Sequence, residues 1–356
     1  MQTAETAPVR SAPHVHPPAQ PVVVFGASGH TGRFVTAELR RRGLPVILSG
    51  RNAEKLAAGD VSGLPVRVAS VDDPDSLDRA LAGAVAVINC AGPFLDTAEP
   101  VIAAALRAGA HYLDVTAEQA AALATFRSYD GPARGAGVTV VPAAGFYGGL
   151  ADLLVTAAGA GWESADEARI AVALDSWRPT DGTRRTGERN TAARMIVTDG
   201  RLEVGDSIAG VEVWDFPAPV GTMEVVPLPM TEIVTISRHL PLSEIRSYMN
   251  QTPLTDLNDQ STPGPEPIDD LGRSGQRFMM DVHVRRGSRT RRATATGKDI
   301  YAVSAPLVAE AAERILRGQT NAVRGGAFAL AELVDPRAFL PALVEAYPGF
   351  EYVVGP

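Results

Sequence analysis

Three glycines near the N-terminus have the spacing of a dinucleotide-binding turn. Gly26, Gly29 and Gly32 follow the β-branched run 22–25 and open the segment 31–42, whose apolar residues recur at helical spacing. In such units the first glycine allows the tight turn, the second admits a pyrophosphate, and the third lets the helix pack near the sheet. The phosphates then meet free N–H groups where the helix begins. The pattern predicts a cofactor loop, to which we also assign Ser28, His30 and Thr31.

The end of the second predicted strand, 46–48, indicates which dinucleotide the loop holds. Folds specific for NAD usually place an acid there to bind the ribose 2′-hydroxyl. This chain has Ser49, Arg51 and Asn52 instead, and the charged fork of arginine suits a phosphate. We therefore expect NADP(H), with Arg51 and Ser49 at the 2′-phosphate. The alternative is that Arg51 is a solvated residue at the start of a helix.

Two further strand ends complete the predicted cofactor site. Asp72 follows the third predicted strand, 66–69, and it either reaches the adenine edge or caps a helix over 76–82. The fourth predicted strand, 85–89, ends at the crevice where cofactors lie in parallel sheets. We expect the backbone there to pass under the ribose or nicotinamide, and the residues concerned are Asn89, Cys90, Ala91, Gly92 and Pro93. For the Cys90 thiol we expect a packing role.

Hydride transfer to a C=N or C=C bond also needs a group that donates a proton or polarises the acceptor. Tyr147 is the first candidate, because it follows the last parallel strand in a glycine-rich loop. A packing tyrosine is the alternative. Asp114 and Glu118 flank the end of the strand predicted over 112–115, and each is either an acid or a structural cap of the next helix.

Candidate substrate-binding residues come from the second half of the chain. Arg178, Arg184 and Arg189 lie in a polar segment that would suit a carboxylate-bearing or carrier-linked substrate. A solvated loop is the alternative. Lys298, one of only two lysines among 33 basic residues, is the remaining candidate. The six histidines have no metal-binding spacing, so we predict no metal site.

The pattern of strands and helices changes part-way along the chain. Strands alternate with helices up to about residue 147, which is typical of βαβ units in a parallel sheet. After about residue 165 strands follow one another, and 278–296 reads as a hairpin. We therefore predict an α/β fold with a Rossmann-type parallel sheet domain and an inserted α+β domain on a largely antiparallel or mixed sheet. In the second half we expect strands at 168–175, 211–216, 223–226 and 233–236, and helices at 186–197, 306–317 and 336–345.

These elements divide the chain into three parts. Residues 1–20 are predicted to be a disordered tail, because they are proline-rich and hold no Phe, Trp or Tyr. The dinucleotide-binding domain comprises 21–150 and about 303–356, and the substrate or dimerisation domain comprises 151–302. Within the latter, 251–275 is rich in proline and glycine and is either a lid or a disordered or passive surface loop.

Four motifs together resemble the saccharopine dehydrogenase-like oxidoreductases. They are GASGHTGR at 26–33, SGRN at 49–52, NCAGPF at 89–94 and GAHYLDVTAE at 109–118. The resemblance covers about residues 22–150 clearly and the remainder more loosely. It implies a Rossmann domain with an inserted domain over the active site, in a group that includes saccharopine reductases and trans-acting enoyl reductases. The enoyl-reductase branch tends to show Gly-Phe-Asp where this chain has Gly-Phe-Tyr147.

Composition excludes several other classes of protein. The net charge of −8, without a dense basic tract, argues against nucleic-acid binding, and no apolar stretch is long enough to span a membrane. A single cysteine excludes a disulfide framework and fits a reducing cytosol. We therefore expect a cytoplasmic NADPH-dependent reductase of a small or carrier-linked metabolite. We also expect a homodimer, because exposed sheet edges are commonly covered by a partner. The alternative function is an NADP-binding regulatory protein without turnover.

Overall fold

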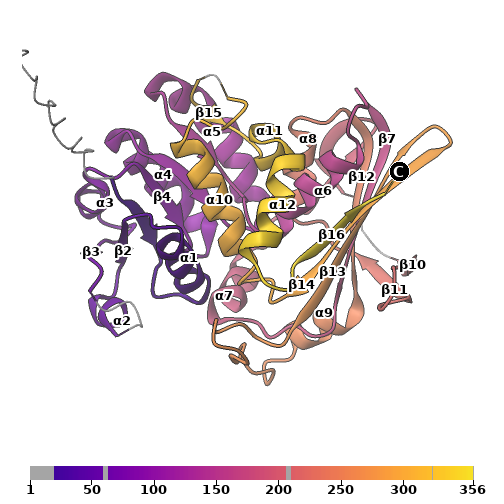
Figure 1. The fold of residues 1–356 in the computed structure, drawn as a ribbon, viewed down its shortest axis with the longest axis horizontal. Coiled ribbons are helices and arrows are strands. Elements are labelled where there is room, and N and C mark those ends of the chain that lie inside the picture. The colour runs from indigo at the N-terminus through magenta and orange to yellow at the C-terminus, as the bar shows by residue number, and fades with distance from the viewer. Residues whose placement is uncertain (1–19, 59–62, 206–209, 323, 356) are drawn as a thin grey trace, which may run out of the picture.

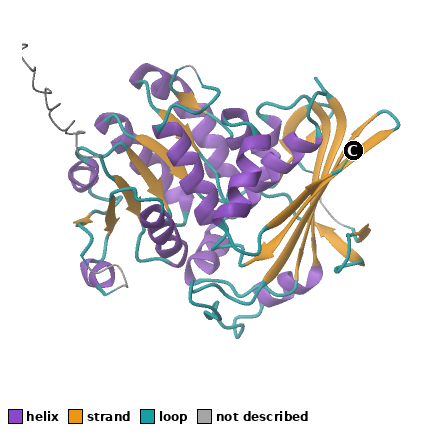
Figure 2. Cartoon of the chain, viewed as in Figure 1, coloured by secondary structure: helices purple, strands orange, loops and turns teal. Residues whose placement is uncertain are grey.

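Two sheets lie at opposite ends of the molecule, with most of the helices between them (Figure 1). This computed structural model describes residues 20–58, 63–205, 210–322 and 324–355. Residues 1–19 of the predicted tail lie outside the described residues. The N-terminal sheet has helices on both faces, whereas the helices beside the long second sheet lie against one face (Figure 2).

The first sheet, sheet A, is parallel throughout and has seven strands in the order β15-β6-β5-β4-β1-β2-β3. Its central strands are fully buried apolar runs, as expected for a sheet covered on both faces. The chain leaves β1 toward β2 on one side and reaches β4 on the other, so the cofactor crevice opens beside β1. The strands are β1 (Val22–Phe25), β2 (Val46–Gly50), β3 (Val66–Val68), β4 (Ala86–Asn89), β5 (His111–Asp114), β6 (Thr139–Val141) and β15 (Gly326–Ala327).

The helices of this half begin and end where the sequence signals place them. Asn52 and Asp73 accept hydrogen bonds at the starts of α2 and α3, and Gly109 ends α4 in the left-handed conformation. The N-cap of α3 is therefore Asp73, whereas the sequence analysis had offered Asp72 as a possible cap of this helix. The elements are α1 (His30–Arg41), α2 (Ala53–Ala57), α3 (Pro74–Leu81), α4 (Phe94–Ala108), α5 (Gln119–Ala136), the π-helix η1 (Phe146–Leu150), α6 (Ala151–Ala158), α10 (Ser304–Leu316), α11 (Leu330–Leu333) and α12 (Pro336–Ala346).

The second sheet, sheet B, has nine strands and is mixed, which confirms the predicted fold class. Its β12–β7 pair is parallel, and the other pairs are antiparallel. Its strands are β7 (Ala165–Leu174), β8 (Met195–Thr198), β9 (Arg201–Val204), β10 (Glu212–Asp215), β11 (Thr222–Pro227), β12 (Leu242–Asn250), β13 (Arg277–Arg286), β14 (Arg289–Lys298) and β16 (Glu351–Val354), and its remaining helices are α7 (Asp181–Arg189), α8 (Thr231–Ser237) and α9 (Gln251–Asn258).

Several sequence predictions in this half were wrong. The strand predicted over 233–236 is part of helix α8, because its apolar residues are buried on all sides, and this burial overrides their β propensity. The helix predicted over 186–197 lies earlier, as α7, and β8 occupies its end. The segment 251–275, for which a lid and a disordered or passive surface loop were the alternatives, is described throughout and begins with α9. Strand β16, assigned by sequence to the first domain, pairs with β14 of sheet B.

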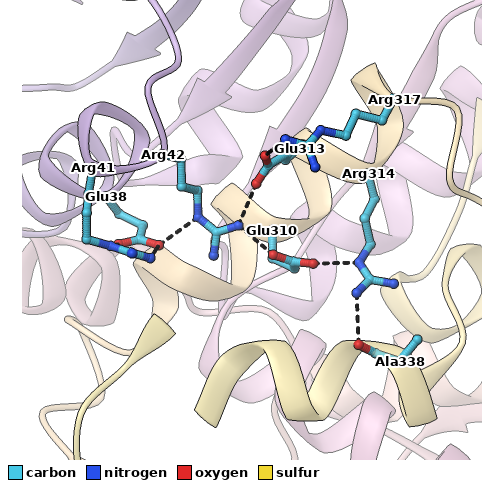
Figure 3. Close-up of polar contacts among 8 residues, drawn as sticks. All are labelled: Glu38, Arg41, Arg42, Glu310, Glu313, Arg314, Arg317 and Ala338. Carbon is cyan, nitrogen blue, oxygen red and sulfur yellow. Dashed lines mark hydrogen bonds and ion pairs between the residues drawn. The ribbon is translucent and has the colours of Figure 1, made fainter. Parts of the chain in front are cut away.

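A buried ion-pair network fastens the C-terminal return onto the first domain (Figure 3). The Arg42 guanidinium, 8% exposed, donates to Glu38 at the end of α1 and to Glu310 and Glu313 on α10. Burial opposes its charge, yet these hydrogen bonds raise the pKa of Arg42 above its ordinary value. Residues at and just before the start of α10 line the cavity that is described in the next subsection. The network therefore holds this side of the cavity against the domain that carries the cofactor loop.

Replacing Arg42 should therefore be costly. Arg42→Met removes the cation that three part-buried carboxylates share, although each keeps a second arginine partner, and we expect the free energy of unfolding in urea to fall by about 1.5–3 kcal/mol. The matched control is Arg41→Ala, because Arg41 is 55% exposed and pairs with Glu38 alone. That control should cost no more than about 1 kcal/mol. Equal losses in the two variants would contradict a structural role for the network.

Candidate cofactor and substrate site

A cavity of about 1460 Å³ runs along the carboxyl edge of sheet A and under α7. The glycine loop after β1 lines one end, together with the turn that follows β4. Residues of η1, the segment 300–304 and α7 complete the lining. Segments from both halves of the chain thus enclose one space.

The glycine loop has the close backbone contacts that a dinucleotide cradle needs. Gly26 has a φ of +83°, and a Cβ there would lie 2.8 Å from the amide nitrogen of Ala91. A Cβ on Gly32 would lie 2.2 Å from the carbonyl oxygen of Gly26, so helix α1 packs directly on the loop. The first-turn N–H groups of α1 then point to the space lined by Ser28, Gly29 and Thr31. These observations fit a bound pyrophosphate.

His30 also fits a polar ligand at this end of the cavity. Its ring packs edge-on against Phe34 and Tyr301, with centroids 5.1 and 5.4 Å away. Burial lowers the pKa of the imidazole, so the ring is neutral near pH 7. Its Nε2 is buried without a hydrogen-bond partner among the described residues. A ligand atom is the natural partner for such a group.

Only some of the residues predicted at the 2′-phosphate end of the site line the cavity. Arg51, Asn52 and Asp72 line it, whereas the buried Ser49 hydroxyl donates to the carbonyl of Arg67 at 2.8 Å. The Asn52 side chain caps α2 by accepting from Lys55 N. Lys55 lines the cavity as well, and sequence reasoning missed it. Its position four residues after Arg51, one helical turn along, was the available signal.

Hydrogen bonds made by a buried polar side chain hold the turn after β4 in place. Asn89 accepts from Ala91 N and donates to Thr97 and Tyr112, so its side chain holds the turn and is not among the lining residues. Cys90, Ala91, Gly92 and Pro93 line the cavity. Burial raises the pKa of the Cys90 thiol far above its usual range, which agrees with the expected packing role.

The two candidate carboxylates serve as structural supports for this turn and its neighbours. Glu118 accepts from the N–H groups of Phe94 and Leu95, and so caps α4. Asp114 accepts from Thr116 N, Ala143 N and the Tyr112 hydroxyl. Burial raises the pKa of Asp114 to about 6 and also raises that of Glu118. Neither residue is among those lining the cavity.

Tyr147, by contrast, lies in the wall of the cavity. The π-helix η1 carries it between Phe146 and Trp177, and the residue is 9% exposed. Its hydroxyl is buried and has no hydrogen-bond partner among the described residues. Burial, with Tyr301 and Glu232 nearby, raises the pKa of Tyr147 well above its usual value. The phenol therefore stays protonated and can donate to a bound substrate.

Trp177, Thr183 and Tyr301 form a hydrogen-bonded cluster in the cavity wall near Tyr147. Trp177 Nε1 donates to the Tyr301 hydroxyl at 2.9 Å, and the Thr183 hydroxyl lies 2.8 Å from the same oxygen. Tyr301 lies just before α10, so the cluster joins α7 to the C-terminal return. Sequence reasoning did not assign a role to Trp177, Thr183 or Tyr301, because only the folded chain brings them together.

Most of the predicted substrate residues are occupied by other protein groups. Arg184 donates to backbone carbonyls of the segment 257–262, and Arg178 lies 3.7 Å from Glu266. Neither lines the cavity, and neither does Lys298. Arg189 lines it while pairing with Asp96. The other lining arginines on this side, Arg185 and Arg194, were not predicted.

Comparison with protein families gives a match over about a third of the chain, near its N-terminus. The model described as "Saccharopine dehydrogenase NADP binding domain" matches residues 22–141. This range of the chain is therefore similar to the NADP-binding domain of saccharopine dehydrogenases. The match confirms the cofactor prediction and the resemblance over this range, and it covers the glycine loop, Arg51 and the turn after β4.

Relatives of the NADP-binding domain include annotated oxidoreductases. The saccharopine dehydrogenase-like oxidoreductase of Bos taurus is 34% identical over 152 residues, which are 37% of this chain and 35% of that protein. The trans-acting enoyl reductase of Mycobacterium bovis is 28% identical over 142 residues, which are 38% of this chain and 34% of that protein. The chain thus matches about a third of the length of these relatives.

One solved structure extends the similarity beyond the NADP-binding domain. Apo saccharopine dehydrogenase (L-Glu forming) from Saccharomyces cerevisiae superposes with a TM-score of 0.67 at 14% identity, covering 95% of this chain and 100% of that one. At this identity the similarity shows the fold alone. It includes the second, mixed sheet as well as the parallel sheet.

Two absences are limited to the part of the chain that the structure describes. There, no group of three or more His, Cys, Asp or Glu side chains is placed to hold a metal ion. No helix in the same ranges has the length and apolar character needed to cross a bilayer. The expected cytoplasmic location stays a prediction.

The packing of α1 on the glycine loop gives a direct test of the cofactor site. In Gly32→Ala the new methyl group meets the Gly26 carbonyl, and overpacking of this kind costs about 1–3 kcal/mol. If the loop shifts to relieve it, the Kd for NADPH measured by fluorescence should rise about tenfold or more. Gly131→Ala is the control, because a Cβ there meets nothing within 4 Å on helix α5. Unchanged NADPH affinity in Gly32→Ala would contradict this placement of the cofactor.

Proposed function

We propose that the protein is an NADPH-dependent oxidoreductase that transfers hydride to an imine or an activated C=C bond of a small or carrier-linked metabolite. The observation that carries this proposal is the position of Tyr147. Tyr147 lines the same cavity as the glycine loop, and its hydroxyl is buried without a hydrogen-bond partner among the described residues. A donor and a hydride source would thus act on one substrate.

Each part of the cavity has a role in this reaction. The glycine loop, Arg51 and Lys55 would bind the phosphates, and the turn after β4 would support the nicotinamide ribose. When bound, the cofactor supplies the hydride. Tyr147 would donate its proton to the substrate nitrogen or to the atom that gains charge as hydride arrives. The Trp177–Tyr301–Thr183 cluster would keep bulk water from this position.

Arginines of α7 and the following loop would orient the substrate. Arg189 and Arg185 line the cavity from α7, and Arg194 lines it from the segment before β8. Their charges favour a substrate that carries a carboxylate or phosphate group. We keep Arg178, Arg184 and Lys298 only as proposed outer contacts, since each lies outside the lining.

The role of Tyr147 can be tested by turnover. NADPH oxidation would be followed with crotonyl-CoA as an activated C=C probe, and with pyruvate plus methylamine as an imine probe. Tyr147→Phe should lower kcat about 10²-fold or more, while the Kd for NADPH stays unchanged. Tyr129→Phe, outside the cavity lining, is the matched control and should retain full activity. Equal kcat in Tyr147→Phe and wild type would remove Tyr147 from the mechanism.

We also propose that sheet B forms a homodimer contact. Both of its edge strands expose valines, since Val213 on β10 is 70% exposed and Val353 on β16 is 68% exposed. Unpaired strand edges with apolar side chains favour association with a second copy. Sedimentation velocity should give about twice the chain mass of 37.3 kDa. A monomer that persists at micromolar concentration would contradict the proposal.

A further inference from the structure

The π-helix η1, which carries Tyr147, is a single turn whose start is held by one side chain from the C-terminal return. It spans Phe146–Leu150. The Phe146 N–H donates to the Ser304 hydroxyl oxygen at 3.1 Å, and both residues are buried. Single-turn π-helices are rare and are frequent at functional sites. A turn this short has few hydrogen bonds of its own, so the orientation of Tyr147 depends on contacts from outside it.

The hydroxyl of Ser304 already has protein partners, although the residue lines the cavity. It donates to the carbonyl of Ile300 at 3.1 Å and accepts from the Phe146 N–H. A serine hydroxyl has only one proton to donate. Because that proton is bound to Ile300, Ser304 is suited to hold another group in place rather than to protonate a substrate.

The contact between Ser304 and the start of η1 is close. A Cβ on Gly145, the residue before η1, would lie 3.2 Å from the Ser304 hydroxyl oxygen. Further along the turn, the Thr235 hydroxyl of α8 donates to the Gly148 carbonyl at 3.2 Å. Tyr147 therefore lies between two points at which other elements hold the backbone of the turn.

Ser304 also connects η1 to the helix that follows the cofactor loop. It is the first residue of α10, and Glu310 and Glu313 on the same helix bind the Arg42 guanidinium at the end of α1 (Figure 3). Helix α1 begins directly after Gly29 of the cofactor loop. Helix α10 is thus fastened at its start to the turn that carries the proposed proton donor, and further along to the helix that opens the cofactor site.

We propose that Ser304 is a positioning residue that sets the place of the Tyr147 hydroxyl relative to the bound cofactor. The inference rests on the proposed function and adds to it a residue with a defined role. Ser304 acts on the substrate through the backbone of Phe146 and the phenol of Tyr147. Hydride and proton must reach one substrate in the correct geometry, so a small displacement of the phenol slows the chemical step.

Removal of the hydroxyl tests this role. Ser304→Ala deletes both hydrogen bonds, and it should lower kcat about tenfold with the crotonyl-CoA or imine probe, while KM and the Kd for NADPH stay unchanged. Ser304→Thr keeps a hydroxyl that can bond the carbonyl four residues earlier, and it should restore most of the lost kcat. The matched control is Ser237→Ala. Ser237 also donates to a carbonyl of its own helix, at Val234, but it lies outside the cavity lining and should leave kcat unchanged.

A double variant tests whether Ser304 acts through Tyr147. In Tyr147→Phe the phenol is already absent, so adding Ser304→Ala should cause no further loss of kcat. If the two losses multiply, Ser304 affects the reaction by a separate route and the inference is wrong. Wild-type kcat in Ser304→Ala would also overturn it, because a merely structural serine would lower stability in urea and leave kcat intact.

Hydrogen exchange separates this inference from the proposed function, because it needs no substrate. With NADPH bound, peptides that cover 146–150 should exchange faster in Ser304→Ala than in the wild type, whereas Ser237→Ala should match the wild type there. If exchange is faster but no probe is reduced by the wild type, the contact from Ser304 holds and the proposed reaction fails. Unchanged exchange in Ser304→Ala, with an active wild type, overturns the inference alone.

Discussion

The close approach of the Gly26 backbone to Ala91, and of α1 to Gly26, is the constraint on which the site depends. A side chain at Gly26 or Gly32 would collide with backbone atoms, so the loop after β1 and the turn after β4 can meet only as they do here. Their contact forms the floor of the cavity. Glu118 and Asn89 fix the turn from below, and the Arg42 network holds α10 against the same domain. Rigid backbone contacts thus position the residues of the site.

The reaction end of the cavity depends on packing between distant parts of the chain. Tyr147 is held by η1, Trp177 comes from the end of β7, and Tyr301 precedes α10. Helix α8 supports η1, since the Thr235 hydroxyl donates to the Gly148 carbonyl. The Tyr147 phenol is kept in its protonated, neutral form because the interior disfavours charge. A neutral phenol in the cavity wall is suited to proton donation.

Local patterns predicted the first half of the chain well and the second half less well. Strands β1, β2 and β4 are buried and largely apolar, and β2 and β4 end in glycine and asparagine, so periodicity and turn chemistry agreed. Helix α8 was misread because Ile233 to Ile236 is β-branched, and only tertiary burial makes it helical. Tyr147 was found from its place after a strand, whereas Tyr301 needed the fold, because its partners Trp177 and Thr183 are remote in sequence. Sequence reasoning assigned Ser49 to the 2′-phosphate. In the structure its hydroxyl instead donates to the Arg67 carbonyl on the neighbouring strand.

Preferential binding of NADPH is the central claim, since every catalytic assignment depends on the cofactor in this cavity. Calorimetric titration of the wild type and of Arg51→Glu with NADPH and with NADH tests it directly. The account predicts that wild type binds NADPH at least about tenfold more tightly than NADH, and that Arg51→Glu loses this preference while keeping NADH affinity. Equal affinity of the wild type for the two nucleotides, or binding of neither, would contradict it.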